Sequence, residues 1–380
     1  MYFNYHGFLK TLRLALFQQP FRLRRWLYVL FFSGLYLSFT TVVALTRWLD
    51  TLLFPGFRKV AVHQPVFILA PPRSGTSFLQ KVLSQDEDRF VYWKMYQTIF
   101  PSICFQKLVD VLDWLDQKLG GGFRRFLGWC EGTWFGSWDD LHRMRLDQPE
   151  EDGAIYLYAF ATEAIYMLFP FVNELWDVGF PDALPAEKRQ KLMAYYRSCL
   201  QRQIYANGHD RTLLIKSTNS SGAVESLKEE FPDARFITIM RHPFESIASN
   251  LSLTVPVWQA HSPEITRNGS ESRAYACLAV EWYKHLFRFR SQVSLENYFC
   301  IDYRDLRNDP AGTIESLYNH FGWNMSEAFR ARLREITSRQ KTFKSNHEYT
   351  LEEFGLSRQW LQSELAPVLK AYGLALDKDR

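Results

Sequence analysis

Residues 65–79 read Pro-Val-Phe-Ile-Leu-Ala-Pro-Pro-Arg-Ser-Gly-Thr-Ser-Phe-Leu and decide the fold of this chain. The apolar run Val66–Ala70 has the length of a buried strand, and after a tight turn a helix with hydroxyl groups in its first turn begins at Thr76. This arrangement holds phosphate groups, because free N–H groups and the helix dipole point at the anion. Arg73 adds a fixed positive charge, and Gly75 lets the backbone approach closely. The stretch therefore predicts an anion-binding loop in an α/β fold.

The loop differs from a Walker A loop. In that motif a lysine follows the last glycine, and the next hydroxyl group binds magnesium. Here the cation, Arg73, precedes Ser74 and Gly75, and Thr76 stands where the lysine would be. This order disfavours a P-loop kinase, for which magnesium-dependent ATP binding would be the evidence. No metal ion is expected in the site.

Two further predicted strands end in cationic side chains. Residues 234–240 (Ala-Arg-Phe-Ile-Thr-Ile-Met) lead directly into Arg241 and a helix. Ser249 lies two turns along that helix, near enough to share an anion with Arg241. Residues 211–217 (Arg-Thr-Leu-Leu-Ile-Lys-Ser) predict a strand that ends at Lys216. Phosphate-binding groups are therefore expected at successive strand ends.

Together these motifs resemble the PAPS-dependent sulfotransferases, in particular their bacterial, membrane-associated members, over roughly residues 60–375. PAPS is 3′-phosphoadenosine 5′-phosphosulfate, and the order cation-Ser-Gly-Thr-Ser is similar to the family's 5′-phosphosulfate loop. The contacts to PAPS that the resemblance implies are Arg73, Ser74, Gly75, Thr76, Ser77 and Phe78 at the 5′ end, Arg241 and Ser249 at the 3′-phosphate, and Tyr303 beside the nucleotide. It also implies that Arg73 and Lys216 are catalytic, with Lys216 stabilising the leaving phosphate. Lys344 or His347 would close over the donor.

The motifs do not identify the catalytic base. Relatives place a Trp-Glu pair before a Phe-Pro-Ser sequence, whereas this chain has Gln97 in place of the acid, and an amide cannot usefully accept a proton. Residues 142–152 hold the other candidates, which are His142, Glu150, Glu151 and Asp152. We favour His142, whose unperturbed pKa is near neutral, and Glu151. The alternative is that this acidic run only caps a helix.

The composition restricts the class of protein. The 380 residues are 47% hydrophobic, which is ample for one large core. The formal net charge of only +4 gives no indication of a nucleic-acid-binding surface. The five cysteines are scattered without Cys-x-x-Cys spacing, so neither a zinc site nor a disulfide framework is expected.

The uncharged run Trp26–Leu45 has the length of a bilayer-spanning helix. Arginines flank it, and tryptophans occupy positions typical of membrane interfaces. A buried helix of a soluble protein is the alternative. The basic residues 1–25 favour a cytosolic N-terminus, which for a single span would leave the domain outside, as in a Golgi type II enzyme.

A bacterial enzyme would need to keep its domain where PAPS is made, in the cytosol. The apolar segment would then lie in the membrane interface or turn back through residues 45–57. We favour a domain at the cytoplasmic face of the inner membrane.

From Pro65 onward, apolar runs alternate with helical patterns, as in an α/β fold of the P-loop-like three-layer αβα class with a central parallel sheet. Strands are expected at 65–70, 212–216, 235–240 and 298–302. Helices are expected at 76–85, 186–206, 222–231, 243–252, 272–293, 310–321, 326–337 and 357–371.

The chain divides into a basic and hydrophobic membrane-associated segment, residues 1–57, and a sulfotransferase domain, residues 60–380. Within the domain, about 90–210 form an insertion, of which 95–180 are expected to make a mostly helical cap over the site. The insertion is rich in tryptophans, which are Trp93, Trp114, Trp129, Trp134 and Trp138. A core is favoured for them over an apolar or sugar-stacking pocket.

These observations lead to one functional hypothesis. The chain is expected to transfer a sulfuryl group from PAPS to the hydroxyl group of an acceptor, of the lipid or glycan class, at a membrane. The alternative from another class is a catalytically silent, nucleotide-binding membrane scaffold, which Gln97 in place of an acid suggests.

Overall fold

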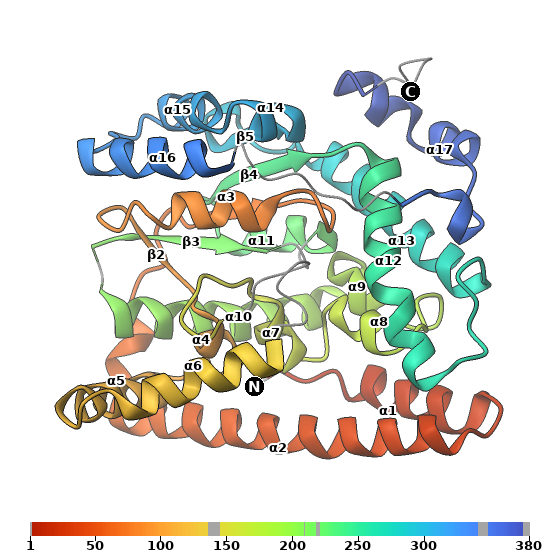
Figure 1. The fold of residues 1–380 in the computed structure, drawn as a ribbon, viewed down its shortest axis with the longest axis horizontal. Coiled ribbons are helices and arrows are strands. Elements are labelled where there is room, and N and C mark those ends of the chain that lie inside the picture. Colours follow the sequence, from red (N-terminus) through yellow and green to blue (C-terminus); the bar gives the residue numbers. More distant parts are fainter. Residues whose placement is uncertain (1, 136–144, 209, 218–220, 341–348, 375–380) are drawn as a thin grey trace.

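A five-stranded parallel sheet forms the centre of the computed structural model (Figure 1), which describes residues 2–135, 145–208, 210–217, 221–340 and 349–374. The strands are β1 (Val66–Leu69), β2 (Phe90–Tyr92), β3 (Thr212–Lys216), β4 (Arg235–Met240) and β5 (Tyr298–Asp302). Their order is β2-β3-β1-β4-β5, and every pair is parallel. The four predicted strands are confirmed, and the short edge strand β2 was not predicted.

Strand β1 is buried on both faces, which is typical of a central strand in a three-layer fold. Successive side chains of a strand point to opposite faces. Val66 and Ile68 therefore pack in one core with Leu79 of α3 (Thr76–Leu83). Phe67 and Leu69 pack in the other core.

The helices of the domain cover the two faces separately. The first core takes in α3, α14 (Tyr303–Asn308), α15 (Pro310–His320) and α16 (Glu327–Gln340). The second takes in α10 (Ala186–Asn207), α11 (Val224–Glu230), α12 (Pro243–His261), α13 (Ser270–Phe289) and α17 (Arg358–Ala371). The predicted helices are confirmed with shifted ends. The largest difference is α12, which continues through Pro256 for nine residues beyond its predicted end at 252.

The insertion is mostly helical, as predicted. Its helices are α4 (Met95–Ile99), α5 (Ile103–Lys118), α6 (Gly122–Phe135), α7 (Gly153–Leu157), α8 (Ala164–Leu168) and α9 (Trp176–Gly179). The prediction of a tryptophan core is wrong in part. Trp93 is buried, but Trp114 and Trp129 are 58% and 66% exposed on α5 and α6. The side chain of Trp134 and the whole of Trp138 lie outside the described residues.

The N-terminal residues form α1 (Tyr5–Arg13), the π-helical segment η1 (Leu14–Gln18) and the long helix α2 (Leu23–Leu53). Among the described residues, α2 is the one helix long and apolar enough to cross a membrane, judged by length and composition alone. It continues without a break to Leu53, so the chain does not turn back before that residue. One face of α2 packs on the domain, where Val29 and Val43 join the second core. The division of the chain near residue 57 stays a prediction.

Candidate active site at the carboxyl edge of the sheet

The loop after β1 has the geometry of an anion-binding loop. Gly75 has a φ of 88°, and a Cβ atom at this position would lie 3.1 Å from the ring of Tyr303. A side chain at this position would therefore be strained by the backbone conformation and would press on the Tyr303 ring. Arg73 also has a left-handed φ, of 65°. The helix α3 begins at Thr76, so its free N–H groups face the space beyond the strand ends.

Side chains from other elements hold this loop in place. The Ser246 hydroxyl, from the first turns of α12, donates a hydrogen bond of 2.7 Å to the carbonyl oxygen of Pro72. The Ser221 hydroxyl donates one of 3.0 Å to the carbonyl oxygen of Ala70. Because these hydroxyl groups bind main-chain oxygens, they fix the path of the loop.

Two arginines meet at the loop. The Arg73 Nε atom donates a hydrogen bond of 3.2 Å to the Ser249 hydroxyl, and Arg241 Nη1 donates one of 2.7 Å to the carbonyl oxygen of Arg73. The Arg241 guanidinium also lies 4.6 Å from the ring centre of Tyr303 and pairs with Glu245 at 3.0 Å. Burial and the neighbouring Arg241 charge lower the pKa of Arg73. An anion between the two guanidinium groups would offset both effects.

Lys216 lies on the other side of the loop. It is the last residue of β3, aligned with Ile68 of β1, so the parallel register carries it to the same edge of the sheet. Its Nζ atom donates a hydrogen bond of 2.9 Å to the Ser77 hydroxyl and pairs with a Glu151 oxygen at 3.1 Å. Lys216 itself is only 4% exposed. A buried ammonium group therefore faces the first turn of α3.

The candidate bases occupy different environments. Glu151 touches Lys216 and its side chain is 35% exposed. Asp152 is buried and accepts hydrogen bonds from the hydroxyl groups of Tyr196 and Ser217, and burial raises its pKa to about 7. His142 lies outside the described residues, as do Lys344 and His347.

The Gln97 side chain lies in a buried amide network. Its side-chain oxygen accepts hydrogen bonds of 2.9 Å from the Lys94 N–H and from Gln203, and its amide nitrogen donates one of 3.1 Å to Gln106. These partners lie on or beside α4, α5 and α10, so Gln97 fixes the packing of the insertion. Its equivalence to the acid of relatives stays a prediction, and the sequence carries no sign of this buried amide network.

The structure thus brings together Arg73, Ser77, Lys216, Arg241, Ser249, Tyr303 and Glu151 from the predicted set. Four further residues were not predicted, and the first is Ser221, whose hydroxyl group binds the Ala70 carbonyl oxygen. Ser246 and Tyr283, whose hydroxyl group donates to the Arg241 carbonyl oxygen at 2.9 Å, act through main-chain contacts that have no sequence signature. Glu163 is a buried acid whose pKa is raised by burial and by the charge of Glu151. A lone acid in the apolar run 154–172 was the available signal for it.

Comparisons with known proteins agree with this geometry. The sequence profile of the sulfotransferase family matches residues 65–327. Omega-hydroxy-beta-dihydromenaquinone-9 sulfotransferase Stf3, from Mycobacterium bovis and from Mycobacterium tuberculosis, is 24% identical over 302 residues, which are 77% of this chain and 72% of the relative.

Two solved structures share the fold. Sulfotransferase STF9 from Mycobacterium avium superposes with a TM-score of 0.75 at 18% identity, over 97% of this chain and 92% of that one. For sulfotransferase STF1 from Mycobacterium tuberculosis, the TM-score is 0.68 at 20% identity, over 96% and 92% of the two chains. With the family profile matching more than half of its residues, this chain belongs to the sulfotransferase family.

Proposed function

We propose that this sulfotransferase uses PAPS as its donor and that its acceptor is the hydroxyl group of a lipid. The observation that carries the proposal is that three cationic side chains meet at the loop before α3 and its first turn: Arg73 and Arg241 at the loop and Lys216 at Ser77. The donor carries phosphate groups at both ends, and the site offers cations on both sides of the loop.

The donor is assigned to the site as follows. The 5′-phosphosulfate would occupy the loop of residues 73–78, against the N–H groups of α3 and Lys216. The 3′-phosphate would take Arg241 and Ser249, and the ring of Tyr303 would lie beside the nucleotide. No metal ion is needed to neutralise the donor, because the arginine and lysine side chains supply the positive charge.

The reaction is an in-line displacement at sulfur. The acceptor oxygen forms a bond to sulfur, the bond between sulfur and the bridging phosphate oxygen breaks, and adenosine 3′,5′-bisphosphate (PAP) leaves. Lys216 would stabilise the charge that grows on the bridging oxygen. The acceptor proton passes to a base, for which we propose Glu151, since a donor phosphate would compete for Lys216 and free the carboxylate. His142 remains the other proposed base.

The lipid acceptor is favoured over a glycan by one relative. The name of Stf3 describes its acceptor as an omega-hydroxy dihydromenaquinone, a lipid with a hydroxyl group. We propose the same class here, and a catalytic domain at the cytoplasmic face of a bacterial inner membrane, where PAPS is available. A Golgi type II arrangement is the alternative.

Two alternative functions have less support. A P-loop kinase is contradicted by membership of the sulfotransferase family. The silent scaffold rested on Gln97, and the hydrogen bonds of that residue in a buried amide network give it a structural role whether or not the enzyme is active. An active enzyme is therefore the better proposal.

Thermal unfolding of the detergent-solubilised protein tests the donor, because a ligand that binds only the folded state raises its stability. We expect PAP to raise the midpoint, and ADP, with or without magnesium, to have a much smaller effect. Transfer of label from [35S]PAPS to hydroxylated polyprenyl lipids, with soluble glycans as the comparison, then tests the acceptor. A shift with ADP and magnesium but none with PAP would overturn the proposal.

A further inference from the structure

The exposed apolar side chains of this protein are gathered in two stretches of the chain. Among the described residues, the large hydrophobic side chains that are exposed belong to residues 5–53 and 108–129, with Leu295 as the single exception. The first stretch covers α1, η1 and α2, and the second covers the α5–α6 hairpin. These helices lie along one edge of the molecule, where α2 packs against α5 (Figure 1). We call this surface the apolar platform.

The helix α2 lies flat on the domain over its whole length. Its 31 residues correspond to about 46 Å. The buried positions are Arg25, Val29, Tyr36, Val43, Arg47 and Asp50, and they follow one another at helical spacing from end to end. A helix that crossed a bilayer would instead be surrounded by lipid over its central twenty residues. In α2 one side faces protein and the other side is exposed.

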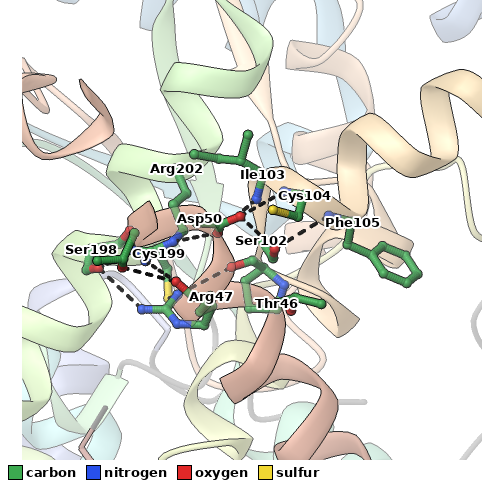
Figure 2. A network of polar contacts seen from close by, with 12 residues as sticks. Thr46, Arg47, Asp50, Ser102, Ile103, Cys104, Phe105, Ser198, Cys199 and Arg202 are labelled. Atoms are coloured by element: carbon green, nitrogen blue, oxygen red, sulfur yellow. Dashed lines mark hydrogen bonds and ion pairs between the residues drawn. The ribbon is translucent and has the colours of Figure 1, made fainter. Parts of the chain in front are cut away.

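Buried polar contacts fix the C-terminal half of α2 to the insertion (Figure 2). The Asp50 carboxylate pairs with Arg202 of α10 at 2.8 Å and accepts hydrogen bonds from the N–H groups of Ile103 and Cys104. The same carboxylate therefore caps α5 and joins it to α2. Moving α2 away from the domain would take this carboxylate with it and leave the buried Arg202 guanidinium without its ion-pair partner, which is strongly unfavourable.

The middle and the N-terminal end of α2 are fixed as well. The Tyr36 hydroxyl donates a hydrogen bond of 2.9 Å to the carbonyl oxygen of Leu157, at the end of α7. Arg25 is buried and pairs with Glu264 at 2.6 Å. The platform is therefore a rigid part of the domain.

The charges at the two ends of α2 complement an anionic lipid surface. Residues 1–49 contain no aspartate or glutamate. Arg22 and Arg24 are exposed at the start of α2, and Arg58 and Lys59 are exposed just after its end. Basic groups at both ends of a helix that lies in the membrane plane would reach lipid phosphates together, and each contributes to binding an anionic surface.

We propose that the apolar platform binds one leaflet of an anionic membrane, with α2 and the α5–α6 hairpin lying in the plane of the interface. The exposed tryptophans Trp48, Trp114 and Trp129 would sit at the level of the headgroups, as amphipathic rings do. The protein then binds the membrane on one side and does not span it.

This arrangement also brings the membrane close to the candidate base. Tyr36 of α2 contacts the last residue of α7, and Glu151 precedes the first turn of the same five-residue helix. A lipid acceptor would therefore enter from the platform side. This point rests on the proposed function, whereas the membrane contact does not.

Flotation of the full-length protein with sealed vesicles tests the surface, using phosphatidylcholine alone and phosphatidylcholine with an equal part of phosphatidylglycerol. We expect binding to both, more tightly to the anionic vesicles. Two double variants remove exposed apolar area and should each weaken vesicle binding by roughly tenfold or more. One combines Trp114→Glu with Trp129→Glu, and the other combines Phe31→Glu with Leu45→Glu. Leu295→Glu, exposed but remote from the platform, should leave binding unchanged.

Labelling with a membrane-impermeant maleimide separates the in-plane helix from a spanning one. Arg24→Cys and Lys59→Cys flank α2, and the unsubstituted protein gives the background of the native cysteines. When the protein is added to preformed vesicles, we expect both positions to be labelled from outside. Protection of one of the two would overturn the in-plane arrangement.

Other outcomes would overturn the membrane contact itself. The first is that the unsubstituted protein floats with neither kind of vesicle. The second is that both double variants float as well as the unsubstituted protein. The third is that the protein forms a stable dimer, which the variants dissociate while their flotation is unchanged. The last result would assign the platform to a second copy of the chain. The thermal shift with PAP, measured on the same samples, reports the donor site independently.

Discussion

Arg241 Nη1 donates a hydrogen bond of 2.7 Å to the main-chain carbonyl oxygen of Arg73. The two residues are 168 positions apart in the chain and follow different strands. The contact holds Arg73 in its left-handed conformation, with φ at 65°, and it places two guanidinium groups at one loop. We therefore propose two roles for Arg241, which fixes the shape of the loop and would bind the 3′-phosphate of the donor.

The first prediction concerns Arg241→Ala. Loss of a charged hydrogen bond to phosphate costs ~1.5–3 kcal/mol, so we expect the affinity for PAP to fall about ten- to hundredfold. Titration calorimetry measures it. The matched control is Arg334→Ala, an exposed arginine on α16, which should bind PAP normally. Unchanged PAP affinity in the Arg241 variant would refute the 3′-phosphate assignment.

Lys216→Ala should act on turnover more than on donor binding. The ammonium group is placed to stabilise charge that develops only as the phosphate leaves, and removal of one such group lowers kcat by about 10²–10³-fold. Initial rates at saturating PAPS measure kcat, and Lys81→Ala, an exposed lysine on α3, is the control. A raised KM for PAPS with an unchanged kcat would show that Lys216 only binds the ground state.

For the base, the variant is Glu151→Gln, which keeps the size of the side chain and removes its ability to take a proton. We expect kcat to fall by about 10²–10⁴-fold, the usual contribution of a general base. His142→Ala is the competing variant and Glu187→Gln, on an exposed face of α10, is the control. Full activity of the Glu151 variant together with loss in the His142 variant would move the role to His142.

Much of this site could be predicted from the sequence because its residues follow strands. Lys216, Arg241 and Tyr303 each stand at the end of a short apolar run or directly after it, and parallel strands bring such positions to one edge. The amide network of Gln97 could not be predicted, because only tertiary contacts reveal it. Trp114 was expected in a core for the same reason, since the apolar face of an amphipathic helix looks alike whether protein or solvent lies opposite.

The strand β2 shows another limit. Its three residues, Phe90–Tyr92, are too short for an alternating pattern, and their pairing with β3 fixes them from a distance of more than a hundred residues. Ser246 and Tyr283 were missed because they bind main-chain oxygens that any residue would present. Non-local hydrogen bonds of this kind leave no periodicity in the sequence.

Gln97→Glu tests whether Gln97 supports the packing of the insertion or belongs to the site. A carboxylate there keeps the acceptor for Lys94 and Gln203 but loses the donor to Gln106 and sets two oxygens against each other. We expect the free energy of unfolding to fall by ~1–3 kcal/mol with no gain of activity. Urea unfolding measures it, against Gln362→Glu on the exposed face of α17. A gain of transferase activity in Gln97→Glu would restore Gln97 to the site.

Asp152 should make stability depend on pH. Burial raises its pKa from 3.8 to about 7 in the folded protein. Between pH 3.8 and pH 7 the folded state holds a proton that the unfolded state has lost. The stabilising contribution of this proton to the free energy of unfolding is therefore fully present below pH 4 and is lost as the pH rises through 7. The difference of about three pKa units corresponds to the order of 4 kcal/mol. The unsubstituted protein should therefore lose stability from pH 5 to pH 8 through this group.

Asp152→Asn isolates this effect, because the amide accepts hydrogen bonds from Tyr196 and Ser217 without titrating. The free energy of unfolding of the variant, relative to the unsubstituted protein, should rise between pH 5 and pH 8. Urea unfolding at both pH values measures the difference, and Asp110→Asn, on the exposed face of α5, should show none. A difference that stays constant with pH would mean that Asp152 is already ionised in the folded protein at pH 5. Tyr196 and Ser217 would then be holding a buried carboxylate, and the local field would favour an anion close to Lys216.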